Sequence, residues 1–285
     1  MCEPGGYSVP HILNPWMEWT EAVDTERALR QWTALADALR EAGAAVEVIH
    51  NHSRSGAMTF TRDTAVTTAV GQAVVLRNVG RRGDLEPQHV VDWLEADGFG
   101  FVEPADDDRL DGGNVVPTAD GWLIGLAPGA TVGVAQRFGA RLAELTGADV
   151  HGVPIRNPKF GHLDTAIADL AGRGWLAYRA AFAQPDLRSP AWRPILRDRP
   201  VIEVTDAEAD ALACNVAVVG DAVIGGLTPR LCRSVERLGL TAVPVDLDEF
   251  RKAGGGAHCL TLELHPIHLR AARPDDRAVT SASTT

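Results

Sequence analysis

The strongest constraint on folding is that short apolar runs alternate along the whole chain with amphipathic helical stretches. Apolar residues recur at three- and four-residue spacing over 20–42, which predicts a long helix. Runs typical of strands are 45–49, 73–79, 122–126, 175–178, 201–204, 216–224, 242–245 and 260–264. Shorter helices are expected at 87–96, 132–145, 206–213, 229–238 and 247–253. The pattern predicts an α/β or α+β chain.

We expect a single domain. Gly and Pro punctuate the loops, but no long Ser, Gly and Pro linker divides the sequence. The predicted domain covers 1–272, and 273–285 is expected to be a flexible polar tail. Close sequence repeats are not visible, although a degenerate repeat of mixed strands and helices stays open.

The net charge of the chain limits which kinds of partner it can bind. The 285 residues carry a formal net charge of -11 at pH 7 and no block of Lys and Arg. This argues against nucleic acid or an anionic membrane surface as a partner, whereas a small cationic substrate suits such a field. With no signal-peptide pattern and no apolar run of about 18 residues, a cytoplasmic location is expected. The sequence leaves homo-oligomer formation open.

Four cysteines are scattered without a CxxC pair, which predicts neither a disulfide framework nor a zinc site. Cys259 differs from the others because three consecutive glycines, residues 254–256, come shortly before it. We place it at the first position of the strand expected at 260–264, facing a cleft. Its neighbour His258 would then point to the opposite side of that strand, without a catalytic role. The alternative is a buried, small apolar side chain.

Three further clusters carry polar side chains suited to a guanidinium ligand. His162 and Asp164 flank Leu163, so on a strand both would face one ligand. Imidazole can relay protons near neutral pH, and a carboxylate can hold a cation. Asp63, in Thr-Arg-Asp, and Asp111, in Asp-Gly-Gly-Asn, add two carboxylates, the natural partners of a planar guanidinium. Each cluster alone is also compatible with an exposed strand edge or an ordinary turn.

Together and in this order, the clusters resemble the guanidine-modifying superfamily of arginine deiminases, dimethylarginine dimethylaminohydrolases, amidinotransferases and arginine dihydrolases. The similarity covers nearly the whole chain. The segments that carry it are 14–18 (Asn-Pro-Trp-Met-Glu), 60–63, 111–114, 162–165 (His-Leu-Asp-Thr), 211–215 and 252–262. The opening segment and 247–262 are most similar to the arginine dihydrolase domain, whereas dimethylarginine hydrolases typically carry Lys after His-Leu.

The resemblance implies an α/β-propeller, the pentein fold, with five strand-helix units around a central active site. It implies that the Cys259 thiolate attacks the guanidinium carbon and that His162 protonates the departing amine. Asp63, Asp111 and Asp164 would hold the guanidinium nitrogens, Asp111 also orienting His162. Water would release the amidino adduct, and no metal or organic cofactor is implied.

Several positions depart from the family pattern. Asp63 stands where the dihydrolases carry Asn, which puts removal of a second nitrogen in doubt. Asn114, which we count among the substrate-binding residues, stands where the family usually has Asp after the two glycines. At 127–131 the sequence lacks the Arg that binds a substrate carboxylate in many family members. Arg77 is the candidate for the other half of that clamp, and an exposed strand Arg is the alternative. The substrate is then an arginine derivative or a guanidine without a free α-carboxylate.

The leading interpretation is therefore a hydrolase that cuts a guanidine C–N bond of arginine or an arginine derivative, giving a ureido product plus ammonia or an amine. An amidinotransferase that passes the amidino group to an amine is the alternative. A non-catalytic pentein that acts by binding is a more remote one. The sequence does not select the guanidine substrate.

Overall fold

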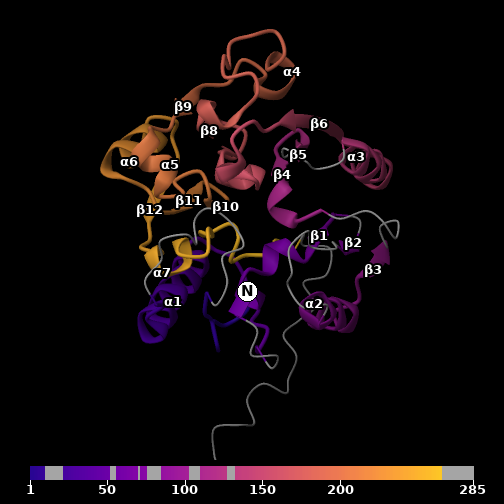
Figure 1. Cartoon of the computed structure of the whole chain (residues 1–285), viewed down its shortest axis with the longest axis vertical. Helices are drawn as coiled ribbons and strands as arrows, with labels where there is room; N and C mark the ends of the chain where they lie inside the picture. Colours follow the sequence, from indigo (N-terminus) through magenta and orange to yellow (C-terminus); the bar gives the residue numbers. More distant parts are fainter. Residues whose placement is uncertain are drawn as a thin grey trace, which may run out of the picture.

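The computed structural model describes residues 1–9, 22–51, 56–69, 71–75, 85–102, 110–126 and 132–264. Four three-stranded sheets within these residues share one plan, in which a first strand pairs antiparallel with a second and the second pairs parallel with a third. A helix lies between the second and third strand of each sheet (Figure 1). The degenerate repeat left open by the sequence is therefore present as a ββαβ unit.

The four units follow one another along the chain. The first contains β1 (Ala65–Thr67), β2 (Gln72–Val75), α2 (Leu85–Ala96) and β3 (Gly100–Val102). The second contains β4 (Val115–Thr118), β5 (Gly121–Leu126), α3 (Val132–Thr146) and β6 (Asp149–Pro154). The third contains β7 (Ile167–Asp169), β8 (Trp175–Ala177), α4 (Arg193–Leu196) and β9 (Val201–Glu203). The fourth contains β10 (Ala217–Val219), β11 (Ala222–Gly225), α6 (Pro229–Glu236) and β12 (Thr241–Pro244).

The two ends of the described chain build a fifth unit. Cys2 forms a parallel bridge with Ile49, and α1 (Thr25–Glu41) lies between them in the sequence, as a helix does between the last two strands of the other units. Leu262 and Leu264 pack against the same apolar cluster as Cys2 and Ile49. The ring is thus closed by segments from opposite ends of the chain, which confirms the predicted pentein propeller.

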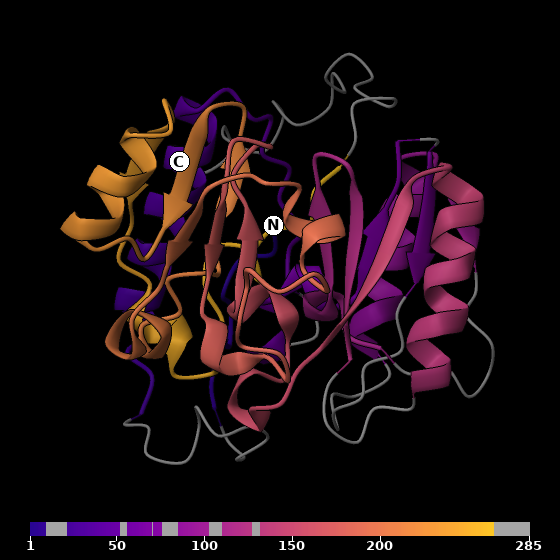
Figure 2. The same ribbon diagram turned by 90° about the horizontal axis from the view of Figure 1, so that it is seen from above.

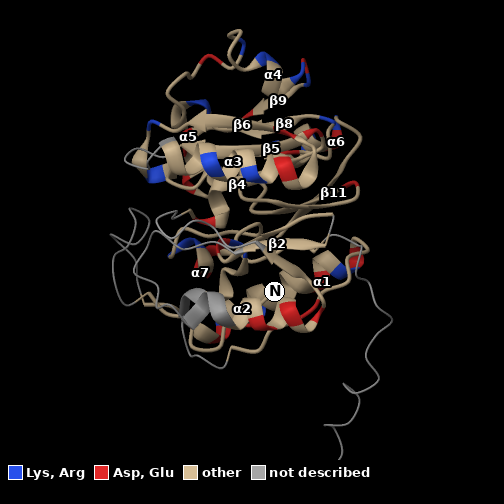
Figure 3. Ribbon diagram, turned by 90° about the vertical axis from the view of Figure 1, so that its right-hand side faces the viewer, with Lys and Arg blue, Asp and Glu red and all other residues tan. Residues whose placement is uncertain are grey.

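Helices lie at the rim of the ring and strands nearer its axis (Figures 1 and 2). The amphipathic face of α1 buries residues such as Trp32 and Leu35, and Asp24 caps its first turn by accepting the Arg27 N–H at 2.9 Å. Basic and acidic residues are interspersed over α3 (Figure 3), where Arg141 pairs with Glu144 at 2.7 Å. In the described part of the chain, every helix is too short or too polar to cross a membrane.

Three predicted strands differ from the structure. The run 216–224 is a hairpin of β10 and β11, because Gly220 adopts a positive φ of 55° and turns the chain. The run 45–49 makes only the bridge at Ile49. Residues 257–260 form a turn, and no strand is assigned at 260–264. The Thr261 N–H donates to the His258 carbonyl at 3.1 Å, so the backbone at Cys259 curls instead of extending.

The helices follow the predictions more closely. Long helical patterns at 20–42, 87–96, 132–145 and 229–238 correspond to α1, α2, α3 and α6. The pattern at 206–213 shortens to α5 (Asp206–Asp210), which begins with a capping box formed by Thr205 and Glu208. The pattern at 247–253 shortens to α7 (Asp248–Arg251). The predicted tail, 273–285, and the domain's last residues lie outside the described part of the chain.

Gly112 shows how closely neighbouring units approach at the axis. It begins the 3₁₀ turn η4 (Gly112–Asn114), which leads into β4. A Cβ atom at this position would overlap the backbone carbonyl of Arg62, which belongs to the preceding unit. Gly133, inside α3, is different, because an added Cβ would meet only the end of the Arg137 side chain at 3.3 Å.

We expect Gly112→Ala to lower the free energy of unfolding by about 1–3 kcal/mol, since backbone on both sides must shift. Gly133→Ala should leave it unchanged or raise it by up to about 1 kcal/mol, because alanine favours the helix. Urea denaturation of both variants measures the difference. Equal stability of the two variants would contradict the close packing of the first two units at Arg62.

Candidate active site

The candidate site lies where each unit turns into its innermost strand. The turns η3 (Thr61–Asp63), η4 and η6 (Leu163–Thr165) precede β1, β4 and β7 respectively. An equivalent turn at 211–214 precedes β10, and another at 257–260 precedes the last described residues, 261–264. Because the units are arranged around an axis, side chains at these five equivalent turns converge. They are Asp63, Asp111 with Asn114, His162 with Asp164, Asn215, and His258 with Cys259.

Cys259 is held between an amide and a carboxylate. Asn215 donates from Nδ2 to the Cys259 sulfur at 3.1 Å, and its Oδ1 accepts the Cys259 N–H, also at 3.1 Å. The thiol donates to Oδ2 of Asp164 at 3.4 Å. These three contacts fix both the backbone and the sulfur of a residue that is 3% exposed. The contact with Asp164 brings together two residues predicted for the site.

His162 lies against two of the predicted carboxylates. Its Nε2 donates to Oδ2 of Asp111 at 3.1 Å, and its Nδ1 lies 3.8 Å from Oδ1 of Asp63. Burial alone disfavours the imidazolium, but Asp63, Asp111 and Asp164 outweigh burial and raise the pKa of His162 from 6.5 to about 9. The ring is therefore protonated at neutral pH, ready to donate a proton.

Asp164 connects the thiol of Cys259 to the imidazole ring of His258. Its burial disfavours the carboxylate, but the hydrogen bond from His258 and the charges of His258, His162 and Arg62 lower its pKa below the usual value. Oδ2 receives both the thiol and the His258 ring. Oδ1 is buried without a hydrogen-bond partner within the described structure. A buried carboxylate oxygen in this state is suited to the N–H groups of a cationic ligand.

The predicted geometry at His162 was only partly right. The two side chains converge as expected, but they do so across the 3₁₀ turn η6 rather than on one face of a strand. Leu163 is fully buried, as predicted. The shorter repeat of a 3₁₀ turn brings Asp164 inward while His162, at the start of the turn, faces Asp111.

Of the remaining predicted residues, the structure describes some and not others. Asn114, the last residue of η4, is buried, and a Cβ on Gly125 would approach its Oδ1 within 2.6 Å, so its side chain packs against β5. Arg77, the opening motif at 14–18 and the segment 127–131 lie outside the described residues. Of the other cysteines, Cys214 is buried in the main core, and burial raises its pKa.

Sequence reasoning missed two residues that contact the centre of the site. Asn215 lies within a segment that matched the family, 211–215, which was the available signal. His258 was assigned to the far side of a strand, and this assignment is wrong. The turn at 257–260 places its Nδ1 2.8 Å from Oδ2 of Asp164, and the residue is 7% exposed.

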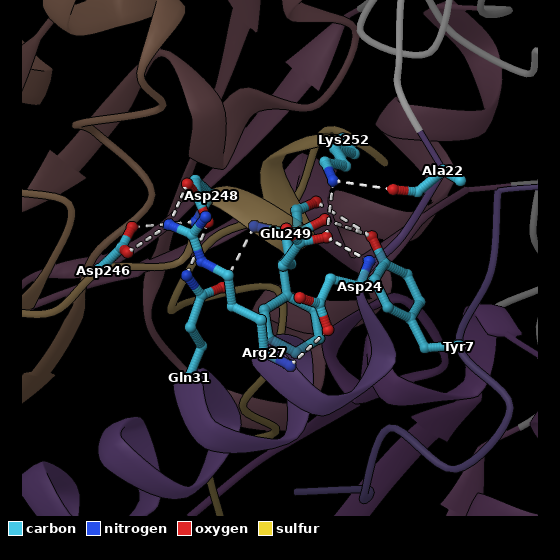
Figure 4. Close-up of polar contacts among 10 residues, drawn as sticks. Tyr7, Ala22, Asp24, Arg27, Gln31, Asp246, Asp248, Glu249 and Lys252 are labelled. Carbon is cyan, nitrogen blue, oxygen red and sulfur yellow. Dashed lines mark hydrogen bonds and ion pairs between the residues drawn. The ribbon is translucent and has the colours of Figure 1, made fainter.

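A polar network anchors the segment that leads to Cys259 (Figure 4). Buried Glu249, in α7, accepts the Asp24 N–H at 2.9 Å and pairs with Lys252 at 2.7 Å. Tyr7 donates to the Glu249 carbonyl at 2.9 Å, and the Glu249 N–H donates to Gln31 at 3.1 Å. These contacts fix α7 to the start of α1.

The electrostatics of the site favour a cation. Burial, followed by the charges of Asp164 and Asp63, raises the pKa of the Cys259 thiol well above its ordinary value. Hydrogen bonds from the Gly256 backbone and Asn215 oppose this effect without cancelling it. A cation bound between the carboxylates would neutralise them and favour the thiolate. The fold and these side chains define a pentein whose axial site holds a cysteine, a protonated histidine and carboxylates.

Comparison with known proteins finds relatives of this chain, although no family model matches it. The chain is 30% identical over 271 residues to the bifunctional arginine dihydrolase/ornithine cyclodeaminase ArgZ of Synechocystis, an alignment covering 93% of this chain. This chain spans only 37% of the length of ArgZ. It is 27% identical over 275 residues to the N(G),N(G)-dimethylarginine dimethylaminohydrolase of Mycobacterium tuberculosis, covering 93% of this chain and 85% of the relative.

Solved structures agree with these relatives. The N-terminal domain of ArgZ bound to substrate matches with a TM-score of 0.83 at 26% identity, covering 92% of this chain and 96% of that domain. A variant of that domain covalently bound to a reaction intermediate also gives 0.83, at 27% identity, covering 92% and 95%. The chain belongs to the guanidine-modifying pentein superfamily, as its motifs predicted.

We expect Asn215→Leu to slow alkylation of Cys259 by iodoacetamide at neutral pH, because the thiolate loses its amide donor. Loss of a hydrogen bond to a charged group, about 1.5–3 kcal/mol, corresponds to roughly a 10- to 100-fold decrease. Peptide mass spectrometry across a pH series measures it. Asn157→Ala is the control, since Asn157 caps a turn by accepting the Lys159 N–H at 3.1 Å. Unchanged alkylation in Asn215→Leu would contradict the assigned contact.

Proposed function

We propose that this chain is a cysteine-dependent hydrolase that cleaves a guanidine C–N bond of arginine or an arginine derivative. The observation that carries the proposal is the carboxylate of Asp164. One of its oxygens contacts the Cys259 thiol, and the other is a buried oxygen that can accept from a cation. ArgZ is named as an arginine dihydrolase, and its domain forms a covalent reaction intermediate. Both findings support the proposal.

In the proposed reaction, the guanidinium binds between Asp63 and Asp164, and its charge offsets theirs. The pKa of Cys259 then falls, and the thiol loses its proton to solvent. The thiolate attacks the central carbon, forming a C–S bond. The tetrahedral adduct collapses with cleavage of one C–N bond, and His162 transfers its proton to the departing nitrogen. This step leaves a positively charged amidino group on sulfur.

Water completes the reaction. His162, now neutral, takes a proton from water as the oxygen adds to the amidino carbon. The C–S bond then breaks as the proton of the added hydroxyl passes to the departing sulfur, which restores the Cys259 thiol. The balance is guanidine plus water giving a ureido product plus ammonia or an amine. Asp111, 3.1 Å from Nε2 of His162, keeps the ring oriented through both proton transfers. Because Asp63 is a carboxylate where the dihydrolases carry Asn, we propose that hydrolysis stops after one nitrogen.

Incubation with arginine, Nω-methylarginines, Nω-hydroxyarginine, agmatine and simpler guanidines should give a ureido product from at least one of them. Mass spectrometry should detect one ammonia or amine per ureido product and a covalent amidino adduct on Cys259. Cys259→Ser should abolish turnover, whereas Cys232→Ser, on α6, should retain it. Product formed only with an added acceptor amine would instead establish an amidinotransferase, and no turnover of any guanidine would overturn the proposal.

The pH dependence should report the protonation of His162. Its imidazolium form persists below about 9, and the first step needs that proton, so kcat/KM should fall as pH rises through about 9. A profile from pH 6 to 10.5 on the best substrate measures the descending limb. His162→Asn should lose most activity together with this limb. A limb that persists in the residual activity of His162→Asn would contradict its assignment to His162.

A further inference from the structure

We propose that His258 is a positioning residue that holds the carboxylate of Asp164 in the orientation needed by both the thiol and the substrate. The inference rests on the proposed function for its effect on turnover. Its geometric basis is the 2.8 Å contact between Nδ1 of His258 and Oδ2 of Asp164, deep in the site. Because Asp164 is a carboxylate and can only accept, Nδ1 carries the hydrogen.

One tight turn presents two groups to a single oxygen atom. His258 and Cys259 are adjacent in the turn 257–260, and both donate to Oδ2 of Asp164. A carboxylate is planar, so fixing Oδ2 from two directions also fixes where Oδ1 points. Oδ1 is the buried oxygen without a hydrogen-bond partner in the described structure. His258 therefore directs it to the place where a guanidinium would donate.

The Asp164 carboxylate needs this restraint because it could otherwise turn away from Cys259 into a neighbouring cavity. Asp164 and His258 line a cavity of about 160 Å³ beside the inner strands β4, β7 and β10. Removing the imidazole would enlarge this cavity, and a charged carboxylate gains by turning toward space that water can enter. With the imidazole in place, the carboxylate stays directed to Cys259.

The other ionisable groups along this cavity do not replace His258. Asp169 accepts from the backbone N–H groups of Ala119 at 2.7 Å and Gly172 at 2.8 Å. Glu263 and the buried Cys214 complete the ionisable lining. Both acidic groups would repel the Asp164 carboxylate rather than donate to it. Among the residues that line this cavity, His258 is the side chain that donates to Asp164, while the charges of His162 and Arg62 act on Asp164 from the rest of the site.

His258 also moderates the effect of Asp164 on the nucleophile. Asp164 disfavours the Cys259 thiolate because the two negative charges lie close together. A donor on Oδ2 draws part of that charge away from the sulfur. Loss of His258 should therefore shift thiol reactivity to higher pH, in addition to slowing turnover. A merely structural histidine would change the unfolding temperature without changing this pH profile.

The test compares three substitutions. Asn places its Nδ2 donor near the position of Nδ1, so His258→Asn should keep most of the activity. His258→Leu removes the donor, and His258→Gln keeps an amide but displaces it by one bond. We expect kcat to fall on the order of 10²-fold in the Leu and Gln variants, the cost of a misplaced reacting group. The fractional loss in kcat should exceed the rise in KM.

Three measurements accompany kcat and KM: the pH dependence of Cys259 alkylation by iodoacetamide, the thermal midpoint, and circular dichroism. His151→Leu, on β6 and away from the site, is the control. Alkylation shifted to higher pH in Leu and Gln but not in Asn would support the proposal, even if wild type turned over no guanidine tested. Activity and alkylation equal to wild type in His258→Gln, or an Asn variant no better than Gln, would overturn it. The Gln comparison remains decisive if the Leu variant does not fold.

Discussion

The position of the nucleophile depends on closure of the propeller ring. Cys259 lies near the end of the described chain, whereas Asn215 and Asp164 come from the middle units, so its contacts with these two residues cannot form locally. At the closing seam, the Arg62 N–H donates to the Cys259 carbonyl at 3.2 Å, and Thr61 donates to the Leu260 carbonyl at 3.2 Å. These bonds join the first unit to the turn that carries the thiol. The N-terminal segment completes the seam through the bridge of Cys2 to Ile49. Complete tertiary structure is therefore a condition for the site, not only its support.

Closure also concentrates charge. Asp63 and Asp164 are each about 2% exposed, next to a thiol and an imidazole. Removing carboxylates from water is costly unless positive charge compensates them. Protonated His162 supplies part of this compensation, and the buried guanidinium of Arg62, which donates to the Val115 carbonyl, supplies more. A bound guanidinium would add the remainder and simultaneously favour the thiolate. Burial of these negative charges therefore favours a cation as the ligand of the site.

Prediction from sequence succeeded where a pattern was long or chemically distinctive. The helices α1, α2, α3 and α6 followed from apolar spacing, and the family followed from motifs distributed over the chain. It failed at the short inner strands. β1 and β7 have three residues each and follow 3₁₀ turns, too short for a period of two to be distinguished from a period of three. The same ambiguity produced the wrong strand at 260–264 and the wrong direction for His258.

The sequence by itself determined which chemical groups are available: one cysteine after a glycine run, one histidine between carboxylate motifs, and the repeated strand and helix segments of a pentein. Side-chain chemistry and long amphipathic patterns are local properties, so they can be recognised in the amino-acid sequence without the fold. Only the tertiary structure decided that Asn215 holds both the backbone and the sulfur of Cys259, and that His258 shares an oxygen of Asp164 with the thiol. The physical reason is that these contacts join residues about 40 to 100 positions apart, and their directions depend on how five separate turns meet at one axis.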